Sequence, residues 1–282
     1  MVENRPFLNF LSHLVLIIGV LIVAFPVYLA LIASTRGPTD FMSGLIPLLP
    51  GPHMLDNYGR MLSSGVSTSG APPLGLMMWN SLIMALTIAI GKIAISILSA
   101  FAIVYFRFPF RQTAFWAIFI TLMLPVEVRI VPTFEVVANL KMLNSYAGLS
   151  IPLIASATAT FLFRQFFLTV PDELMEAARV DGAGALKFFR DILLPLSRTN
   201  IAALFVILFI YGWNQYLWPL LITTDERYYT VVMGIKRMAD VADAIPQWNV
   251  VMAAVVLAML PPVLVVIFMQ RLFVKGLVET EK

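Results

Sequence analysis

Three ionisable side chains, Lys92, Glu127 and Arg129, lie within long apolar runs of the sequence. A charge at membrane depth costs several kcal/mol unless it is paired or hydrated, so such residues mark ion pairs or solute pathways. At the helical rise per residue, Lys92 and Glu127 lie about 18 and 20 Å from the inner ends of their runs. They are therefore able to form an ion pair, whereas Arg129 points to a different face. Alternatively, Lys92 or Arg129 supplies positive charge to an anion pathway, because ammonium and guanidinium groups favour phosphate over neutral sugar.

A second set of polar residues, Asn214 and Gln215, lies among aromatic residues in the run Tyr211-Gly212-Trp213-Asn214-Gln215-Tyr216-Leu217-Trp218-Pro219-Leu220. Trp218 and Tyr216 are typical of an aromatic belt at the membrane interface. Asn214 and Gln215 need another explanation, because buried amides require hydrogen-bond partners.

Motifs for catalysis on the chain itself are missing from the sequence. It has no cysteine and only two histidines, which excludes thiolate chemistry and makes a histidine-based metal site improbable. Gly91-Lys92 lacks the upstream glycine of a phosphate-binding loop, and neither Gly-x-Ser-x-Gly nor His-Glu-x-x-His occurs. We expect a protein that is not an enzyme, with no catalytic residue, no metal and no cofactor of its own.

The composition of the chain indicates that membrane-spanning helices position these polar and charged residues. The chain is 60% hydrophobic and 12% charged with a mean hydropathy of +0.89, far from the average soluble domain. We predict an all-α integral membrane protein, a single domain over 1–282 in contact with membrane lipid. No basic tract is long enough for nucleic acid. Six apolar stretches are long enough to span a membrane, near 14–34, 79–104, 114–131, 149–167, 201–223 and 250–273.

A polar segment over 171–198 interrupts the apolar runs and predicts two short helices. Pro171 and the two acids after it favour the start of the first, which Gly182 ends. The second helix places Phe188 and Phe189 on one face, and we expect Pro195 to stop it. Such a segment cannot lie in lipid, so we expect it to dock a partner.

Loop charges predict the orientation of the chain. An even number of spans places both termini and the 171–198 segment on one side, where arginine and lysine accumulate in short loops. The positive-inside rule puts that side in the cytoplasm.

The sequence also resembles a family. Glu176-Ala177-Ala178, Asp181-Gly182-Ala183, the Phe188-Phe189 pair and Pro195-Leu196-Ser197 are similar to the coupling loop of bacterial ABC importer permeases. The Tyr211–Leu220 run resembles the carbohydrate-uptake type of this family, which is described as the inner-membrane component of binding-protein-dependent transport. Leu124–Pro132 and Asn139–Leu143 resemble its members that import sn-glycerol-3-phosphate.

This resemblance implies the type I importer permease fold, with six transmembrane helices and a cytoplasmic helix-turn-helix coupling loop that inserts into an ATPase cleft. It implies a heterodimer with a sister permease, two copies of an ABC ATPase that hold ATP and Mg, and a periplasmic solute-binding protein. The location would be the bacterial inner membrane, with the outer loops 35–78 and 224–249 facing the binding protein. The substrate would be sn-glycerol-3-phosphate or a glycerophosphodiester. By the same resemblance, Trp213, Asn214, Gln215 and Tyr216 are candidates for the pathway.

Two alternatives remain at this point. A permease for a neutral sugar or oligosaccharide would share the fold and the coupling loop. A secondary transporter driven by an ion gradient would use Lys92, Glu127 and Arg129 as an ion site or a relay. Dependence on a partner ATPase separates the second alternative from the importers.

Overall fold

The computed structural model describes residues 6–41, 44, 47–65, 70–121, 126–241 and 245–279, without the side chains of residues 6, 126, 127 and 271–279. In these ranges every regular element is a helix, which agrees with the predicted all-α class. The chain forms two compact units, Met1–Gly75 with Gly234–Leu260, and Leu76–Met233 with Pro261–Lys282. The prediction of a single domain over 1–282 stays a prediction.

The first unit contains helix α1 and two shorter helices, and part of α13 and α14 belongs to it. Their bounds are α1 Pro6–Ser34, η1 Pro38–Phe41, α2 Met54–Ser63, α13 Val231–Ala239 and α14 Trp248–Glu279. Asn57 ties the unit together, since its Nδ2 donates to the carbonyls of Ser34 at 2.9 Å and Arg36 at 2.8 Å. Its Oδ1 accepts from Asn249 Nδ2 at 2.7 Å.

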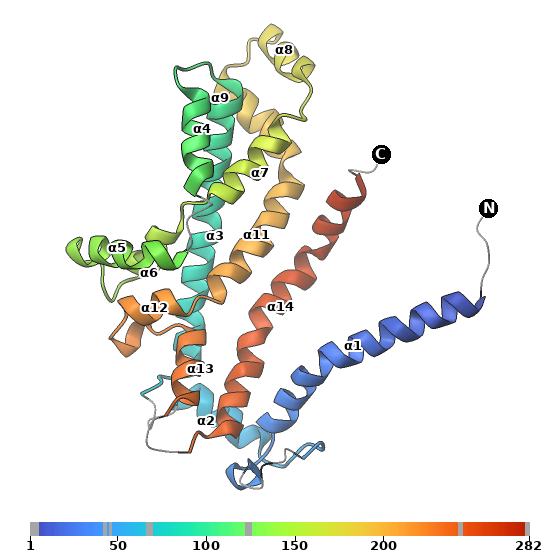
Figure 1. Ribbon diagram of the computed structural model, residues 1–282, viewed down its shortest axis with the longest axis vertical. Coiled ribbons are helices and arrows are strands. Elements are labelled where there is room, and N and C mark those ends of the chain that lie inside the picture. The colour runs from blue at the N-terminus through green and yellow to red at the C-terminus, as the bar shows by residue number, and fades with distance from the viewer. Residues whose placement is uncertain are drawn as a thin grey trace. The chain divides into compact units, whose positions relative to one another are not determined.

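The second unit is built along α3, Leu74–Tyr105 (Figure 1). The other helices are α4 Arg111–Ile120, α5 Val126–Asn139, α6 Tyr146–Ser150, η4 Ile151–Leu153, α7 Ala157–Phe167, α8 Asp172–Val180, α9 Ala185–Phe188, the π-helix η5 Phe189–Leu193, α10 Leu194–Leu196, α11 Arg198–Trp213, α12 Leu217–Ile222 and η6 Glu226–Tyr228.

Helices α3 and α11 approach closely because Gly212 carries no side chain. A Cβ placed there would lie 2.8 Å from the Cα of Ala85, so only glycine fits without a backbone shift. A buried cluster then joins α3 to α5, α6 and α12, through Met84, Ile88, Val137, Leu149, Trp218 and Ile222. The indole of Trp218 donates to the Gly148 carbonyl at 3.0 Å, which satisfies its one polar atom inside this core.

Three of the expected spans coincide with single long apolar helices. Among the described residues these are Phe7–Ser34, Leu74–Tyr105 and Trp248–Gln270. Two bent pairs raise the number to five if each pair is one span. They are Tyr146–Leu153 with Ala157–Phe167, bent by 47°, and Ala185–Leu196 with Arg198–Trp213, bent by 70°.

The remaining predicted spans differ from continuous helices. The expected span 149–167 breaks before Ser156, whose hydroxyl caps α7 by accepting from the Ala159 N–H at 3.2 Å. The expected span 201–223 breaks at Asn214–Tyr216, between α11 and α12. For 114–131, α4 ends at Ile120 and α5 begins at Val126, and residues 122–125 lie outside the described ranges. Six spans therefore stay a prediction.

Candidate functional site

The segment 171–198 folds as its sequence predicts up to its midpoint. Helix α8 begins after Pro171 with Asp172 and Glu173 in its first turn, where acidic groups complement the free N–H donors. It ends in a Schellman motif, in which Ala183 N–H donates to the Ala178 carbonyl at 2.8 Å and Gly182 N–H to the Arg179 carbonyl at 3.0 Å. Gly182 has φ +70°, the left-handed conformation that this motif requires.

The second helix ends one residue after Pro195, close to where the proline is expected to stop it. Pro195 lies inside α10, which continues to Leu196, and the 70° bend follows at Ser197. The proline is accommodated by the preceding π-helix, where the Leu194 N–H donates to the Phe189 carbonyl five residues back. Proline has no N–H and cannot donate to the carbonyl four residues back. The wider π-turn ahead of it shifts the hydrogen-bond pattern, so fewer backbone groups are left without a partner.

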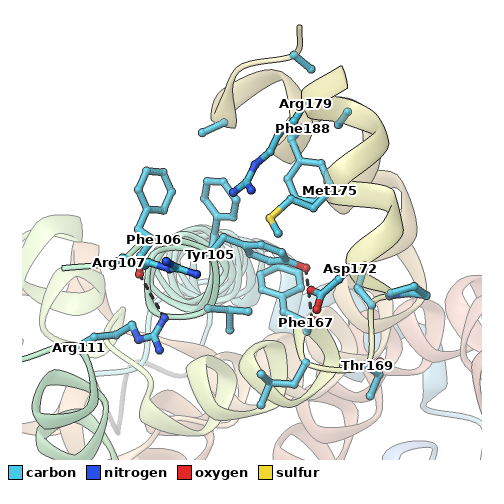
Figure 2. A pocket seen from close by; sticks show the side chains of 18 residues that line it. Tyr105, Phe106, Arg107, Arg111, Phe167, Thr169, Asp172, Met175, Arg179 and Phe188 are labelled. Atoms are coloured by element: carbon cyan, nitrogen blue, oxygen red, sulfur yellow. Dashed lines mark hydrogen bonds between the residues drawn. The ribbon is translucent and has the colours of Figure 1, made fainter. Parts of the chain in front are cut away.

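Phe188 and Phe189 pack inside this chain instead of facing outward. Phe188 is buried, and its ring lies 5.3 Å from the ring of Tyr105 on α3 (Figure 2). The ring of Phe189 lies 4.9 Å from that of Phe101, also on α3. The two rings therefore fix the segment to the end of α3, and a partner would meet other residues.

The outward face of α8 carries Glu176, Ala177 and Val180, and Val180 is 87% exposed. Beyond the turn at Asp181–Ala183, Leu186 is 76% exposed. Sequence reasoning missed Val180 and Leu186 as candidates. Their signal was present, because residues 173, 176, 177 and 180 share one face of a helix while the buried Ala178 and half-buried Met175 share another.

Lys92 is buried, and its Nζ lies 4.0 Å from the centroid of the Tyr211 ring. This is a cation–π contact between α3 and α11. Arg129 on α5 lies close enough for its charge to act on both Lys92 and Tyr211. Gln215 Nε2 donates to the Tyr211 carbonyl at 3.1 Å. The structure thus gathers three predicted residues, Lys92, Arg129 and Gln215, around a tyrosine that sequence reasoning did not select.

The structure does not bring the other predicted pathway residues into the cluster around Lys92. Trp213 is buried and stacks on Phe209 at 5.9 Å between centroids, so it belongs to the packing of α11. Asn214 is exposed at the end of α11, and Tyr216 is half-buried. Glu127 lies in α5, but its side chain is outside the described residues, and so is the predicted pair with Lys92.

At the start of α3, Asn80 and Ser81 hold a distant loop. Asn80 Nδ2 donates to the carbonyls of Arg227 at 2.8 Å and Tyr229 at 2.9 Å, and its Oδ1 accepts from the Tyr146 hydroxyl at 2.7 Å. Ser81 Oγ accepts from the Val231 N–H at 2.8 Å.

In the same loop, the Arg227 guanidinium hydrogen-bonds Asp225 and lowers the pKa of that carboxyl group. Asp225 also accepts from the Arg227 N–H, so both groups stay ionised. The described residues contain no group of three histidine or acidic side chains that would hold a metal ion.

Comparisons with known proteins identify the family of this chain. Residues 92–279 match the family described as the binding-protein-dependent transport system inner membrane component. The sn-glycerol-3-phosphate transport system permease proteins of Brucella melitensis and Agrobacterium fabrum are both 60% identical to this chain over 282 residues, covering each chain completely. That of Yersinia enterocolitica is 59% identical over the same length.

A crystal structure of a bacterial ABC transporter for import of the acidic polysaccharide alginate contains a chain with the same fold. Its TM-score is 0.82 at 19% identity, with 96% of this chain and 98% of that chain covered. The fold is therefore the type I ABC importer permease fold, which the sequence predicted. The chain is a transport subunit and not an enzyme, and it belongs to the inner-membrane components of binding-protein-dependent ABC transport systems.

Proposed function

We propose that this chain is the permease subunit that translocates sn-glycerol-3-phosphate, or glycerophosphodiesters, in an ATP-driven importer. The observation that carries the proposal is the end-to-end identity of about 60% to permeases named for that substrate. A neutral-sugar permease of the same family is the nearest competing function.

The cluster around Lys92 supports an anionic substrate. Lys92 and Arg129 carry like charges that repel each other. An arriving phosphate relieves this repulsion, and it is a stronger ligand for the two cations than a neutral hydroxyl. Tyr211 positions the ammonium group through its ring face.

The coupling function rests on the outward face of the segment 171–198. Glu176, Ala177, Val180 and Leu186 are exposed and would enter the ATPase cleft, with Glu176 pairing a basic group there. Asp181, Gly182 and Ala183 form the turn between the helices, and Phe188 and Phe189 transmit its movement to α3. ATP and Mg are held by the ATPase.

The assembly we propose is a heterodimer with a sister permease, two ATPase copies and a periplasmic binding protein. The six predicted spans form one membrane domain with both termini in the cytoplasm. This orientation follows from the charged loops and puts the segment 171–198 on the ATPase side.

The test is ATP-dependent uptake in proteoliposomes that contain this chain, its sister permease, the ATPase and the binding protein. Labelled sn-glycerol-3-phosphate and maltose are compared in parallel, and we expect uptake of the phosphate ester alone. Uptake of maltose alone would overturn the substrate and keep the importer. Uptake that follows an ion gradient without ATP would overturn both.

A second experiment tests coupling. Glu176→Lys should leave membrane insertion intact and lower transport per ATP hydrolysed, because it reverses the charge on the docking face. Arg190→Gln, on an exposed arginine of the π-helix η5, is the matched control. Wild-type transport by an inserted Glu176→Lys chain would contradict the docking role of this face.

A further inference from the structure

A large cavity lies between α8 and the end of α3, on the inward side of the segment 171–198 (Figure 2). Its volume is about 1060 Å³, which exceeds what a free inorganic anion needs. The floor is aromatic, formed by Phe101, Tyr105, Phe167 and Phe188. None of these residues belongs to the outward docking face or to the cluster around Lys92.

Three arginines line this cavity from two separate parts of the chain. Arg107 lies in the turn between α3 and α4, Arg111 is the first residue of α4, and Arg179 lies in the last turn of α8. Figure 2 shows Arg179 reaching back toward the side of the cavity where Arg107 lies. None of the three forms an ion pair within the part of the chain that the structure describes. Asp172 is the one acidic residue of the lining, so the cavity carries net positive charge.

The turn and the first residue of α4 place aromatic beside basic residues around one proline, in the order Phe106-Arg107-Phe108-Pro109-Phe110-Arg111. Phe106, Phe108 and Phe110 are 44%, 39% and 81% exposed. Phe110 also has φ +61°, a conformation that costs a phenylalanine about 1–2 kcal/mol. A short turn that exposes three phenyl rings beside arginines fits the membrane interface, where rings enter the acyl boundary and guanidinium groups remain among phosphates.

The volume of the cavity, its aromatic floor and its three arginines together indicate that its ligand is an amphipathic anion. A basic pocket at the end of membrane helices is the kind of site that holds anionic lipid headgroups. The aromatic floor accommodates glycerol and the first methylene groups, and the arginines bind phosphate in bidentate fashion. An acidic protein segment would match the arginines but leaves the exposed phenyl rings without a role.

We propose that this cavity binds the headgroup of an anionic phospholipid, with Arg107, Arg111 and Arg179 around the phosphate diester. Since Arg179 belongs to α8, a bound lipid joins the membrane interface to the coupling segment. The inference requires that the chain lies in the inner membrane, and it does not depend on the identity of the substrate.

The experiment uses the assembled importer in nanodiscs of phosphatidylcholine with a minor fraction of phosphatidylglycerol. Native mass spectrometry counts the phosphatidylglycerol retained by the released complex. The double variant Arg107→Gln/Arg111→Gln should weaken retention about 25-fold, at about fivefold for each basic group at a membrane surface. Arg107→Lys/Arg111→Lys should keep part of it, and Arg190→Gln, outside the cavity, should keep all of it.

Three results would overturn the proposal. The first is equal retention of phosphatidylglycerol by the wild type and the glutamine double variant. The second is inorganic phosphate binding to the lipid-free complex, with the same arginine dependence and no retained lipid, which would identify a free anion as the ligand. The third is loss of the ATPase from the double variant in pure phosphatidylcholine, which would assign the arginines to protein docking.

Discussion

Substitutions of Gly182 test whether coupling depends on the backbone conformation of the turn at Asp181–Ala183. A Cβ at this position meets no atom within 4 Å, so Gly182→Ala introduces no clash. The whole effect comes from φ +70°, which costs an alanine about 1–2 kcal/mol and costs asparagine less. Proline cannot adopt this φ, and it also removes the N–H that donates to Arg179. The native turn should therefore lose about 5- to 30-fold in population with alanine, and more with proline.

The assay measures transport and ATP hydrolysis together in proteoliposomes, with membrane insertion checked by protease accessibility. We expect transport per ATP hydrolysed to fall in the order glycine, asparagine, alanine, proline, while insertion stays unchanged. Gly184→Ala is the matched control, because Gly184 has φ −72° and open space around its Cα.

Two outcomes would refute this reasoning. If Gly182→Ala and Gly182→Pro both coupled as the wild type does, the shape of the turn would not matter for docking. If Gly184→Ala uncoupled transport to the same degree, the effect would come from side-chain bulk in the loop and not from the left-handed conformation.

Three further predictions concern the membrane helices. Asn80→Ala should lower the free energy of unfolding by about 1–3 kcal/mol, because the buried carbonyls of Arg227 and Tyr229 lose their donor. Thermal unfolding in detergent measures this, and a melting temperature equal to that of the wild type would contradict it. Gly212→Ala should cost about 1–3 kcal/mol through overlap with Ala85, whereas Gly75→Ala, with nothing within 4 Å, serves as the control in the same assay. Tyr211→Leu should raise the KM for an anionic substrate and Tyr211→Phe should not, because the ring face holds the buried lysine; equal KM values in uptake assays count against it.

Much of the fold could be predicted from composition and local chemistry. The long helices α1, α3 and α14 follow from apolar runs, and the Schellman turn follows from an isolated glycine after a charged helix. The breaks in the other spans carried weaker signals. Ser156 lies inside an apolar run, yet its hydroxyl caps α7, and a π-helix precedes Pro195 and accommodates it.

The candidate site was harder to predict because its residues take their roles from contacts distant in sequence. Asn80 and the loop at Arg227 are 147 positions apart, and no local pattern announces their hydrogen bond. Lys92 lies over an aromatic ring from α11, a contact that no local pattern predicts, while its predicted pair with Glu127 stays a prediction. From the sequence, Phe188 and Phe189 resemble part of a docking surface, but tertiary packing places both rings against α3.

Helix α3 is held at both ends by contacts of different kinds. Asn80 and Ser81 bind the loop at 227–231. Phe101 and Tyr105 contact the phenylalanine pair about 30 to 37 Å away along the helix axis. No proline interrupts the helix between them, so it transmits force like a stiff rod. A tilt imposed at one end should therefore also move the other end, so this single helix can act as a lever across the membrane.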